Sequence, residues 1–517
     1  MDTRPGETSM IGWSDPPTEI VVREPAPEPP RPDAPSRRLA WVLWALPALV
    51  AAALGVWRLT VPALWADELA TWGAVRLSWS QLRELTSNVD FVLAPYYAAM
   101  KAYTSIAGTS TVALRLPAVI AMIATALLTT ALGRRLGGPW VGLFAGLIYA
   151  LLPVTSRYAQ EARSYGFVVF ATTLALLCLV RLLERPTVLR AAGYAGALVL
   201  AGFSHPLSTL LVLAAHAVAA AWRRSGRAAV FWVPAAVIGG LPALVLTALG
   251  SRQRGQLSWI QVLTVDLMKL VPERIFMSGA VAGIVLALAI LGVRASSDAA
   301  KSDAAKSDAA ALAAAGFAPI LLLFTAGLFE PIWSARYVLV ALPALAVLAA
   351  AAAMRFGPRP TTVVVLLLAL VGWPYQLDAR TPAGHSEDSA KIAAVIEPLY
   401  RPGDVAVFAD THPSIPWAAR DIYERYLPSP RPPDVLRTEP QRHDGHFLAT
   451  ECPDAACLGT PPRIWVIRVD YTTDPFALMS PAKRKLLSDN YRQTRRWQYT
   501  LLTITLLERK PAPKAAR

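Results

Sequence analysis

Between residues 40 and 377, eleven apolar runs follow one another, and these runs constrain the fold more than any other feature of the sequence. Most are long enough to cross the hydrocarbon core of a bilayer as a helix, and tilt accommodates the shorter ones. Only 17% of the residues are charged, which excludes a soluble enzyme, a disordered protein and a disulfide scaffold. We therefore predict an all-α polytopic membrane protein. The runs are 40–58, 112–132, 139–153, 165–182, 190–203, 206–222, 229–249, 276–293, 311–328, 336–353 and 361–377.

The two ends of the chain differ in character from this region. Residues 1–39 contain nine prolines and no apolar run, which predicts a disordered tail without a cleaved signal peptide. Residues 380–517 contain short β-rich runs at 404–409, 463–469 and 499–509, and a helix-like stretch at 389–400. They predict a small α/β domain outside the membrane. Cys452 and Cys457 of this domain form a disulfide or remain two free thiols.

Basic residues orient the membrane domain, 40–379. Residues 93–107 form a twelfth span or a helix that lies flat on the membrane surface. With a flat helix, loops on the side of the N-terminal tail carry thirteen Arg and Lys, and the later opposite loops carry seven. Positive charge gathers on the cytoplasmic side, so we place the tail in the cytoplasm and both 93–107 and the C-terminal domain outside a cell membrane. The net charge of +14 thus needs no nucleic acid partner.

Acidic residues then fall mostly on the outer face. Nine of the thirteen Asp and Glu between residues 40 and 379 lie in outer loops, and none lies inside a span. Three of the others belong to a repeated Lys-Ser-Asp-Ala-Ala stretch, 296–310, which we interpret as a cytoplasmic linker without chemistry. The polar chemistry is therefore expected outside, above all in the first outer loop, 59–111.

Asp67 and Glu68 are the candidate catalytic residues. They follow the first span directly, and two adjacent carboxylates at a membrane surface cost desolvation energy unless they bind something. One carboxylate would accept a proton from an attacking hydroxyl, and the other would bind a metal or a sugar. In the alternative, Asp67 only caps a helix over 69–79.

A second motif, 156–165, leaves the third span on the outside. Its Arg157 and Arg163 are able to bind a phosphate, and its Tyr158 and Tyr165 are side chains that tolerate the membrane interface. In the alternative, the motif is only a belt of aromatic side chains with snorkelling arginines. His205 lies in a break between two spans and is a candidate for metal or phosphate binding, or a structural residue.

Arg336 and Tyr337 stand before the tenth span and close to Glu330. Arg336 is a candidate for substrate binding; in the alternative, it only forms an ion pair with Glu330. The sequence contains no Walker motif and no other glycine-rich phosphate-binding loop. Since the outer face has no supply of nucleotide sugars, a transferase there needs a donor that arrives in the membrane.

The order of these motifs over residues 40–380 resembles the GT-C superfamily of membrane glycosyltransferases. Within it, the chain resembles the family 39-like bacterial mannosyltransferases, which are related to protein O-mannosyltransferases and aminoarabinose transferases. The resemblance consists of LWADELAT after the first span, Asp90 followed by Pro-Tyr-Tyr (95–97), ALRLP (113–117), YAQEARSYGF (158–167), Ser-His (204–205) and ARYVLVALPA (335–344).

The resemblance implies surface helices that frame a cavity at the membrane and a polyprenyl-phosphate-linked sugar as donor. It makes Asp67 the base, Arg163 a ligand of the lipid phosphate, and Glu68 a ligand of a metal, sugar or acceptor. A divalent cation, Mg²⁺ or Mn²⁺, would be held by Glu68 or His205, although the His and two Pro of many relatives after the second-motif Asp are missing here. The candidate substrate-binding residues are Asp90, Tyr97, Tyr158, Glu161, Arg163, Tyr165, His205 and Arg336.

The sequence therefore predicts an inverting glycosyltransferase without a nucleotide cofactor. It would move a hexose or pentose, with mannose favoured, from polyprenyl phosphate to a glycan, lipid or protein acceptor outside the membrane. One alternative is a transporter or flippase of lipid-linked sugars, which should place charges within its spans. The other is a surface scaffold, which leaves the acids of the first loop without a role.

Overall fold

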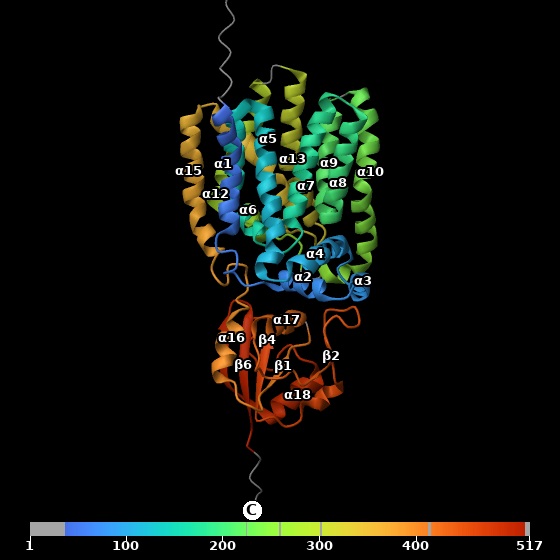
Figure 1. Ribbon diagram of the computed structural model, residues 1–517, viewed down its shortest axis with the longest axis vertical. Coiled ribbons are helices and arrows are strands. Elements are labelled where there is room, and N and C mark those ends of the chain that lie inside the picture. Colours follow the sequence, from blue (N-terminus) through green and yellow to red (C-terminus); the bar gives the residue numbers. More distant parts are fainter. Residues whose placement is uncertain (1–36, 224, 258–259, 300–301, 412–414, 512–517) are drawn as a thin grey trace, which may run out of the picture.

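The computed structural model describes residues 37–223, 225–257, 260–299, 302–411 and 415–511. The expected disordered tail lies outside these residues, except that α1 begins at Arg37. Most helices run side by side in one bundle, with a smaller α/β part attached at one end (Figure 1). The bundle comprises α1 (Arg37–Val56), α5 (Thr111–Leu151), α7 (Tyr165–Glu184), α8 (Val188–Ser204), α9 (Pro206–Arg223), α10 (Gly226–Gly250), α12 (Gly279–Ala299), α13 (Asp303–Gly327), η3 with α14 (Ala335–Ala341, Leu342–Met354) and α15 (Pro358–Asp378).

Helix α5 is two antiparallel helices joined by a sharp turn. Gly137 and Gly138 have non-helical backbone angles, and Gly138 has a φ of +85°. Beyond the turn the second helix packs against the first. The two are so close that a Cβ atom at Gly142 would lie 2.7 Å from the carbonyl oxygen of Thr130. Eight described helices, α5 among them, are long and apolar enough to span a membrane, and 41–56 and 188–204 are shorter apolar helices. With α5 counted twice, these are the eleven expected spans.

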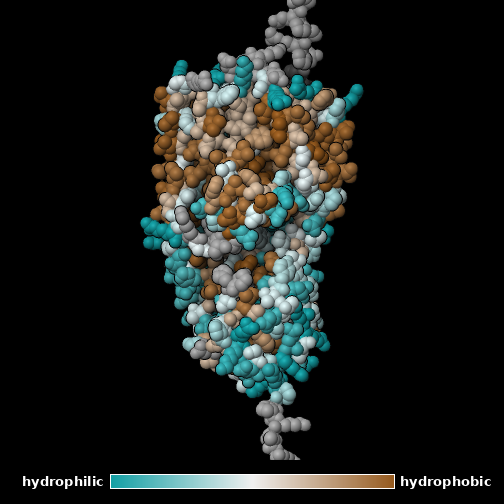
Figure 2. All heavy atoms as spheres, turned by 180° about the vertical axis from the view of Figure 1, so that it is seen from behind, coloured by the Kyte–Doolittle hydropathy of each residue, from teal (hydrophilic) through white to brown (hydrophobic). Residues whose placement is uncertain are grey.

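The outward faces of the bundle are apolar. Leu370 of α15 is 71% exposed and Val230 of α10 is 70% exposed, whereas α14 is enclosed by the other helices. On the face that Figure 2 shows, apolar side chains form a belt over the bundle, and hydrophilic side chains lie at its far rim and over much of the α/β part. This distribution fits a bundle surrounded by lipid, and the predicted class of polytopic membrane protein is confirmed.

Short helices gather at the end of the bundle that faces the α/β part (Figure 1). Residues 93–107 form α4 there, and Lys101 of α4 donates hydrogen bonds to the carbonyl groups of Val75 and Leu77 at the end of α2. This lysine thus completes a neighbouring helix end. The helices outside the bundle are α2 (Ala66–Arg76), α3 (Trp79–Asn88), η1 (Phe91–Leu93), α4 (Ala94–Ala107), α6 (Pro153–Ala159), η2 (Ser251–Leu257) and α11 (Val265–Phe276).

The described residues of 296–310, which we interpreted as a linker, are mostly helical. The ends of this segment continue α12 and α13, and Asp308 binds Arg135 with an Oδ2–Nε distance of 2.6 Å. Arg135 also contacts Glu184 at 3.1 Å, so this end of the bundle carries an ion-pair cluster.

The C-terminal part contains a four-stranded sheet in the order β1-β4-β6-β5. β1 is parallel to β4, and the other pairs are antiparallel. Three of its strands lie in the predicted β-rich runs, and Cys452 and Cys457 are joined by a disulfide. The elements are α16 (Lys391–Ile396), η4 (Glu397–Leu399), β1 (Val405–Phe408), α17 (Pro416–Tyr426), β2 (Arg437–Glu439), β3 (Thr450–Glu451), η5 (Pro453–Leu458), β4 (Arg463–Arg468), α18 (Pro481–Asn490), β5 (Tyr491–Tyr499) and β6 (Leu502–Arg509).

One apolar core joins this part to the helices at the end of the bundle. Leu69 and Trp72 of α2 belong to the same buried cluster as Ile422 of α17 and Trp465 of β4. The hydroxyl of Tyr426 also accepts a hydrogen bond from the backbone N–H of Leu64 at 2.7 Å. The first outer loop is therefore packed between the bundle and the sheet.

Candidate active site

The first turn of α2 carries Asp67 and Glu68. The helix begins at Ala66, and its N-cap is Trp65, whose side chain makes no capping hydrogen bond. Asp67 lies inside the helix, so the interpretation of Asp67 as a cap of a helix over 69–79 was wrong. The backbone N–H of Ala66 instead donates to Oε1 of Glu387 at 3.0 Å, from the segment that follows α15.

Asp67 lies between two guanidinium groups. Its Oδ2 is 2.6 Å from Nη1 of Arg336 and 3.9 Å from Nε of Arg163. The Asp67 side chain is 25% exposed, whereas those of Arg163 and Arg336 are about 10% and 13% exposed. This carboxylate is therefore reachable from outside, and the two cations that flank it are largely shielded from water.

Glu68 points the other way and is fully buried. Its carboxylate forms a bidentate pair with Arg115, with distances of 2.8 Å to Nε and 2.7 Å to Nη2. It also accepts the backbone N–H of Ala162 at 2.9 Å and lies 3.4 Å from Nδ1 of His385. Burial opposes the charge of Glu68, but Arg115 outweighs this effect and lowers the pKa of Glu68 below its ordinary value. Both oxygens are engaged by the protein itself.

Arg163 is tied to the surface helix α4. Its Nη1 donates to the hydroxyl of Tyr97 at 3.1 Å, and that hydroxyl donates to Oδ2 of Asp90 at 2.7 Å. Burial raises the pKa of Asp90, although the charge of Arg163 and the hydrogen bond from Tyr97 oppose this shift. Three predicted substrate-binding residues thus form one chain of contacts that starts at Asp67.

Glu161 is buried at the turn between α6 and α7. One of its carboxylate oxygens binds Arg157, and the other, Oε1, is buried without a hydrogen-bond partner in the described part of the chain. Burial raises the pKa of Glu161. The predicted phosphate ligand Arg157 is therefore already paired with a carboxylate, which leaves Arg163 as the better candidate of the two.

Aromatic rings line the site beside Arg336. The guanidinium of Arg336 lies 5.8 Å from the ring of Tyr165 and 5.6 Å from that of Trp65. Tyr165 packs against Tyr158 with ring centroids 5.5 Å apart and against His205 at 5.7 Å. Tyr158 and Tyr165 belong to the motif at 156–165, and His205 and Arg336 belong to later motifs. The structure therefore brings residues of separate motifs to one place, beside Trp65 of the first motif.

The predicted metal ligands do not fit a cation site. Both oxygens of Glu68 accept from Arg115, and Nδ1 of His205 accepts the backbone N–H of Ser208 at 3.2 Å. Burial, together with the charges of Arg336 and Arg163, lowers the pKa of His205 to about 3. Among the described residues no group of three or more His, Cys, Asp or Glu is able to hold a metal ion. We therefore derive no step through a metal.

Three residues that contact the first turn of α2 were not predicted from the sequence as site residues. Arg115 lies in the ALRLP motif, and an arginine in an apolar run, near the end that we expect outside, is a signal that a buried partner exists. His385 and Glu387 carry no local signal. They belong to the segment after α15, more than 300 positions away from the carboxylate and the N–H group that they contact.

Comparisons with known proteins agree with this architecture. Residues 94–249 match the family model of dolichyl-phosphate-mannose-protein mannosyltransferase. Two crystal structures of ArnT from Cupriavidus metallidurans are similar over 91% of this chain and 98% of theirs. The complex with undecaprenyl phosphate has 12% sequence identity and a TM-score of 0.54, and the apo state has 13% sequence identity and a TM-score of 0.57. No curated protein matches the sequence. The chain has the fold of the GT-C superfamily, as its motifs predicted.

Proposed function

We propose that this GT-C-fold protein is an inverting glycosyltransferase that moves a sugar from a polyprenyl phosphate to a hydroxyl of an acceptor. Mannose is the favoured sugar because of the family model matched by residues 94–249. We further propose that the first outer loop and residues 380–517 lie outside a cell membrane, with the N-terminus in the cytoplasm, which follows from the distribution of Arg and Lys.

The observation that carries this proposal is the position of Asp67 between Arg163 and Arg336 at the end of an apolar bundle. A lipid phosphate held at the membrane surface would meet two guanidinium groups, which bind phosphate oxygens as paired donors. An acceptor hydroxyl would meet the partly exposed carboxylate beside them. Donor and acceptor would thus converge on one place.

In the reaction, Asp67 accepts the proton of the acceptor hydroxyl, whose oxygen attacks the anomeric carbon of the donor sugar. The new glycosidic bond forms as the bond from that carbon to the phosphate oxygen breaks, and polyprenyl phosphate leaves with both electrons of that bond. Arg163 and Arg336 stabilise the negative charge that develops on the phosphate. Because the phosphate competes with Asp67 for Arg336, donor binding would also release the base.

Glu68 takes a positioning role in this scheme. Its pair with Arg115 and its bonds to Ala162 and His385 hold the first turn of α2, and Glu387 holds the same turn through Ala66. These contacts orient the neighbouring Asp67 toward the arginines, as preorganised sites require.

The test is transfer by the purified full-length chain. We expect label to pass from radiolabelled polyprenyl phosphomannose to a membrane extract with wild-type protein, and not with Asp67→Asn. A matched donor that carries arabinose distinguishes hexose from pentose. If wild type releases no sugar from either donor while it binds both, the proposed function is wrong.

A further inference from the structure

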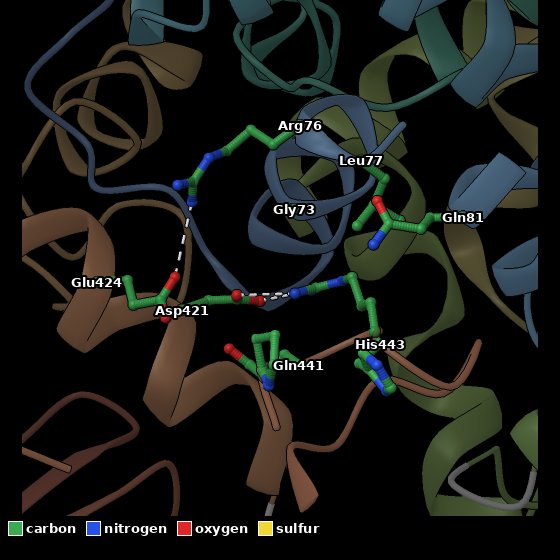
Figure 3. A pocket seen from close by; sticks show the side chains of 10 residues that line it. Gly73, Arg76, Leu77, Gln81, Asp421, Glu424, Gln441 and His443 are labelled. Atoms are coloured by element: carbon green, nitrogen blue, oxygen red, sulfur yellow. Dashed lines mark hydrogen bonds and ion pairs between the residues drawn. The ribbon is translucent and has the colours of Figure 1, made fainter. Parts of the chain in front are cut away.

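A polar cavity lies at the opposite end of α2 from Asp67. It has a volume of about 220 Å³ and is bounded by Gly73, Arg76 and Gln81 on one side and by Glu424, Gln441 and His443 on the other. Figure 3 shows these side chains around one space, with α2 and the following loop facing α17 and the segment 440–443. The cavity therefore exists only where the first outer loop meets the C-terminal part.

The charges on its walls are balanced. Arg76 contacts Glu424 at 3.7 Å, and His443 lies 3.7 Å from the carboxylate of Glu439. Arg442, which is 3% exposed, forms a bidentate pair with Asp421 with distances of 3.0 and 2.6 Å. Since each of these cationic or titratable groups has a carboxylate beside it, the cavity offers no surplus charge to a phosphate or another anion.

Two residues that line the cavity also carry buried polar atoms without partners. Oε1 of Gln441, an acceptor, and Nε of Arg442, a donor, are both buried and have no hydrogen-bond partner in the part of the chain that the structure describes. Buried polar atoms without partners are rare in native proteins, and each calls for an explanation. Arg442 also has a φ of +66°, a backbone conformation that is uncommon for a residue other than glycine and is often found at functional sites.

Arg442 connects this cavity to the site around Asp67. Its guanidinium lies against Gly73, where a Cβ atom would come within 2.3 Å of Cζ, so only glycine leaves room for it. Its charge also opposes the rise in the pKa of Asp90, which belongs to the chain of contacts from Asp67. Along α2, Gly73 is six residues from Asp67, a rise of about 9 Å.

We infer that this cavity binds an uncharged carbohydrate unit of the acceptor, one or more residues away from the hydroxyl that reacts. A sugar hydroxyl both donates and accepts hydrogen bonds, which matches a wall of amide, carboxylate and guanidinium groups without net charge. This inference rests on the proposed function for its role in transfer, but the binding itself is measurable without any reaction.

His443→Trp tests the inference, with His446→Trp as the matched control. Both histidines are exposed and lie in the same segment, but only His443 lines the cavity. Saturation-transfer NMR on the full-length protein would use methyl glycosides of mannose, glucose and arabinose as probes. We expect wild type and His446→Trp to bind at least one of them and His443→Trp to lose at least ten-fold in affinity. Inorganic phosphate should not compete.

Equal binding by His443→Trp, competition by phosphate, or no binding of any probe to wild type would overturn the inference. In the transfer assay, His443→Trp should raise the KM for the acceptor and leave the KM for the donor unchanged. If wild type binds the glycosides but transfers no sugar, the proposed function fails and the carbohydrate site stands. If wild type transfers sugar and His443→Trp keeps its acceptor KM, the carbohydrate site fails alone.

Discussion

Arg336 and Asp67 are 269 positions apart in the sequence, yet Nη1 of Arg336 lies 2.6 Å from Oδ2 of Asp67. The pair places the carboxylate of the first outer loop against the start of the tenth span. Because this oxygen is already in contact with Arg336, the proposed reaction requires Arg336 to move to another anion before Asp67 meets the acceptor hydroxyl, and the donor phosphate would be that anion.

The first prediction concerns Asp67→Asn. The amide keeps the shape of the side chain but has little basicity, so we expect the transfer rate to fall by about 10²- to 10⁴-fold. Membrane insertion should be unchanged, because Asp67 caps no helix and the amide oxygen can still accept a hydrogen bond from Arg336. A transfer rate near that of wild type would show that Asp67 is not the base.

The second prediction concerns Arg163. Lysine keeps the charge but loses the planar pair of donors, so Arg163→Lys should still impair transfer. Arg163→Ala removes charge-assisted hydrogen bonds worth about 1.5–3 kcal/mol and should weaken donor binding by about ten- to a hundred-fold. The measurement is the Kd for undecaprenyl phosphate. Unchanged binding by both variants would assign the phosphate to Arg336 alone.

The third prediction concerns the buried pair of Glu68 and Arg115. Glu68→Ala leaves Arg115 buried without its carboxylate, which should destabilise the protein by about 3–5 kcal/mol. The apparent Tm of the purified protein in detergent measures this loss. Glu84→Ala, in the exposed part of the same loop, is the control and should keep the Tm of wild type. If Glu68→Ala keeps its Tm and loses only transfer, Glu68 acts on substrate directly.

The fourth prediction concerns pH and Glu387. Burial raises the pKa of Glu387 from its ordinary value of 4.5 to about 8, and the nearby charges of Asp67 and Glu68 act in the same direction. Between these two values the unfolded chain releases the proton and the folded protein keeps it, so stability falls as the pH rises, by up to about 1.4 kcal/mol per pH unit.

Glu387→Gln keeps the acceptor for the N–H group of Ala66 and cannot ionise. Its Tm should equal that of wild type near pH 4.5 and exceed it at pH 8. A difference in Tm that stays constant across this range would contradict the shift.

The fifth prediction concerns orientation. A reporter that is active only in the cytoplasm should be active when fused after Arg135, in the turn within α5, and silent when fused after Gly250, at the end of α10. The two positions lie at opposite ends of the bundle, because an odd number of spans separates them. The reverse pattern would place Asp67 in the cytoplasm.

The sequence was sufficient to predict the spans, because hydropathy is a local property of each run and a membrane requires only enough apolar length. It also predicted three strands of the sheet, but β5 was mostly missed. β5 (Tyr491–Tyr499) is an edge strand with largely exposed, polar side chains, so it lacks the apolar pattern that marks a buried strand.

The sequence by itself also predicted that most acids of the membrane domain fall in the outer loops, and the order of the motifs indicated the superfamily. Only the tertiary structure decided which charges pair: Asp67 with Arg336, Glu68 with Arg115, and Glu387 with the first N–H group of α2. Two neighbouring acids that look equivalent in the sequence thus have different surroundings, one partly exposed and one fully buried. The physical reason is that burial and charge pairing depend on contacts between distant segments, and no local pattern of residues encodes these contacts.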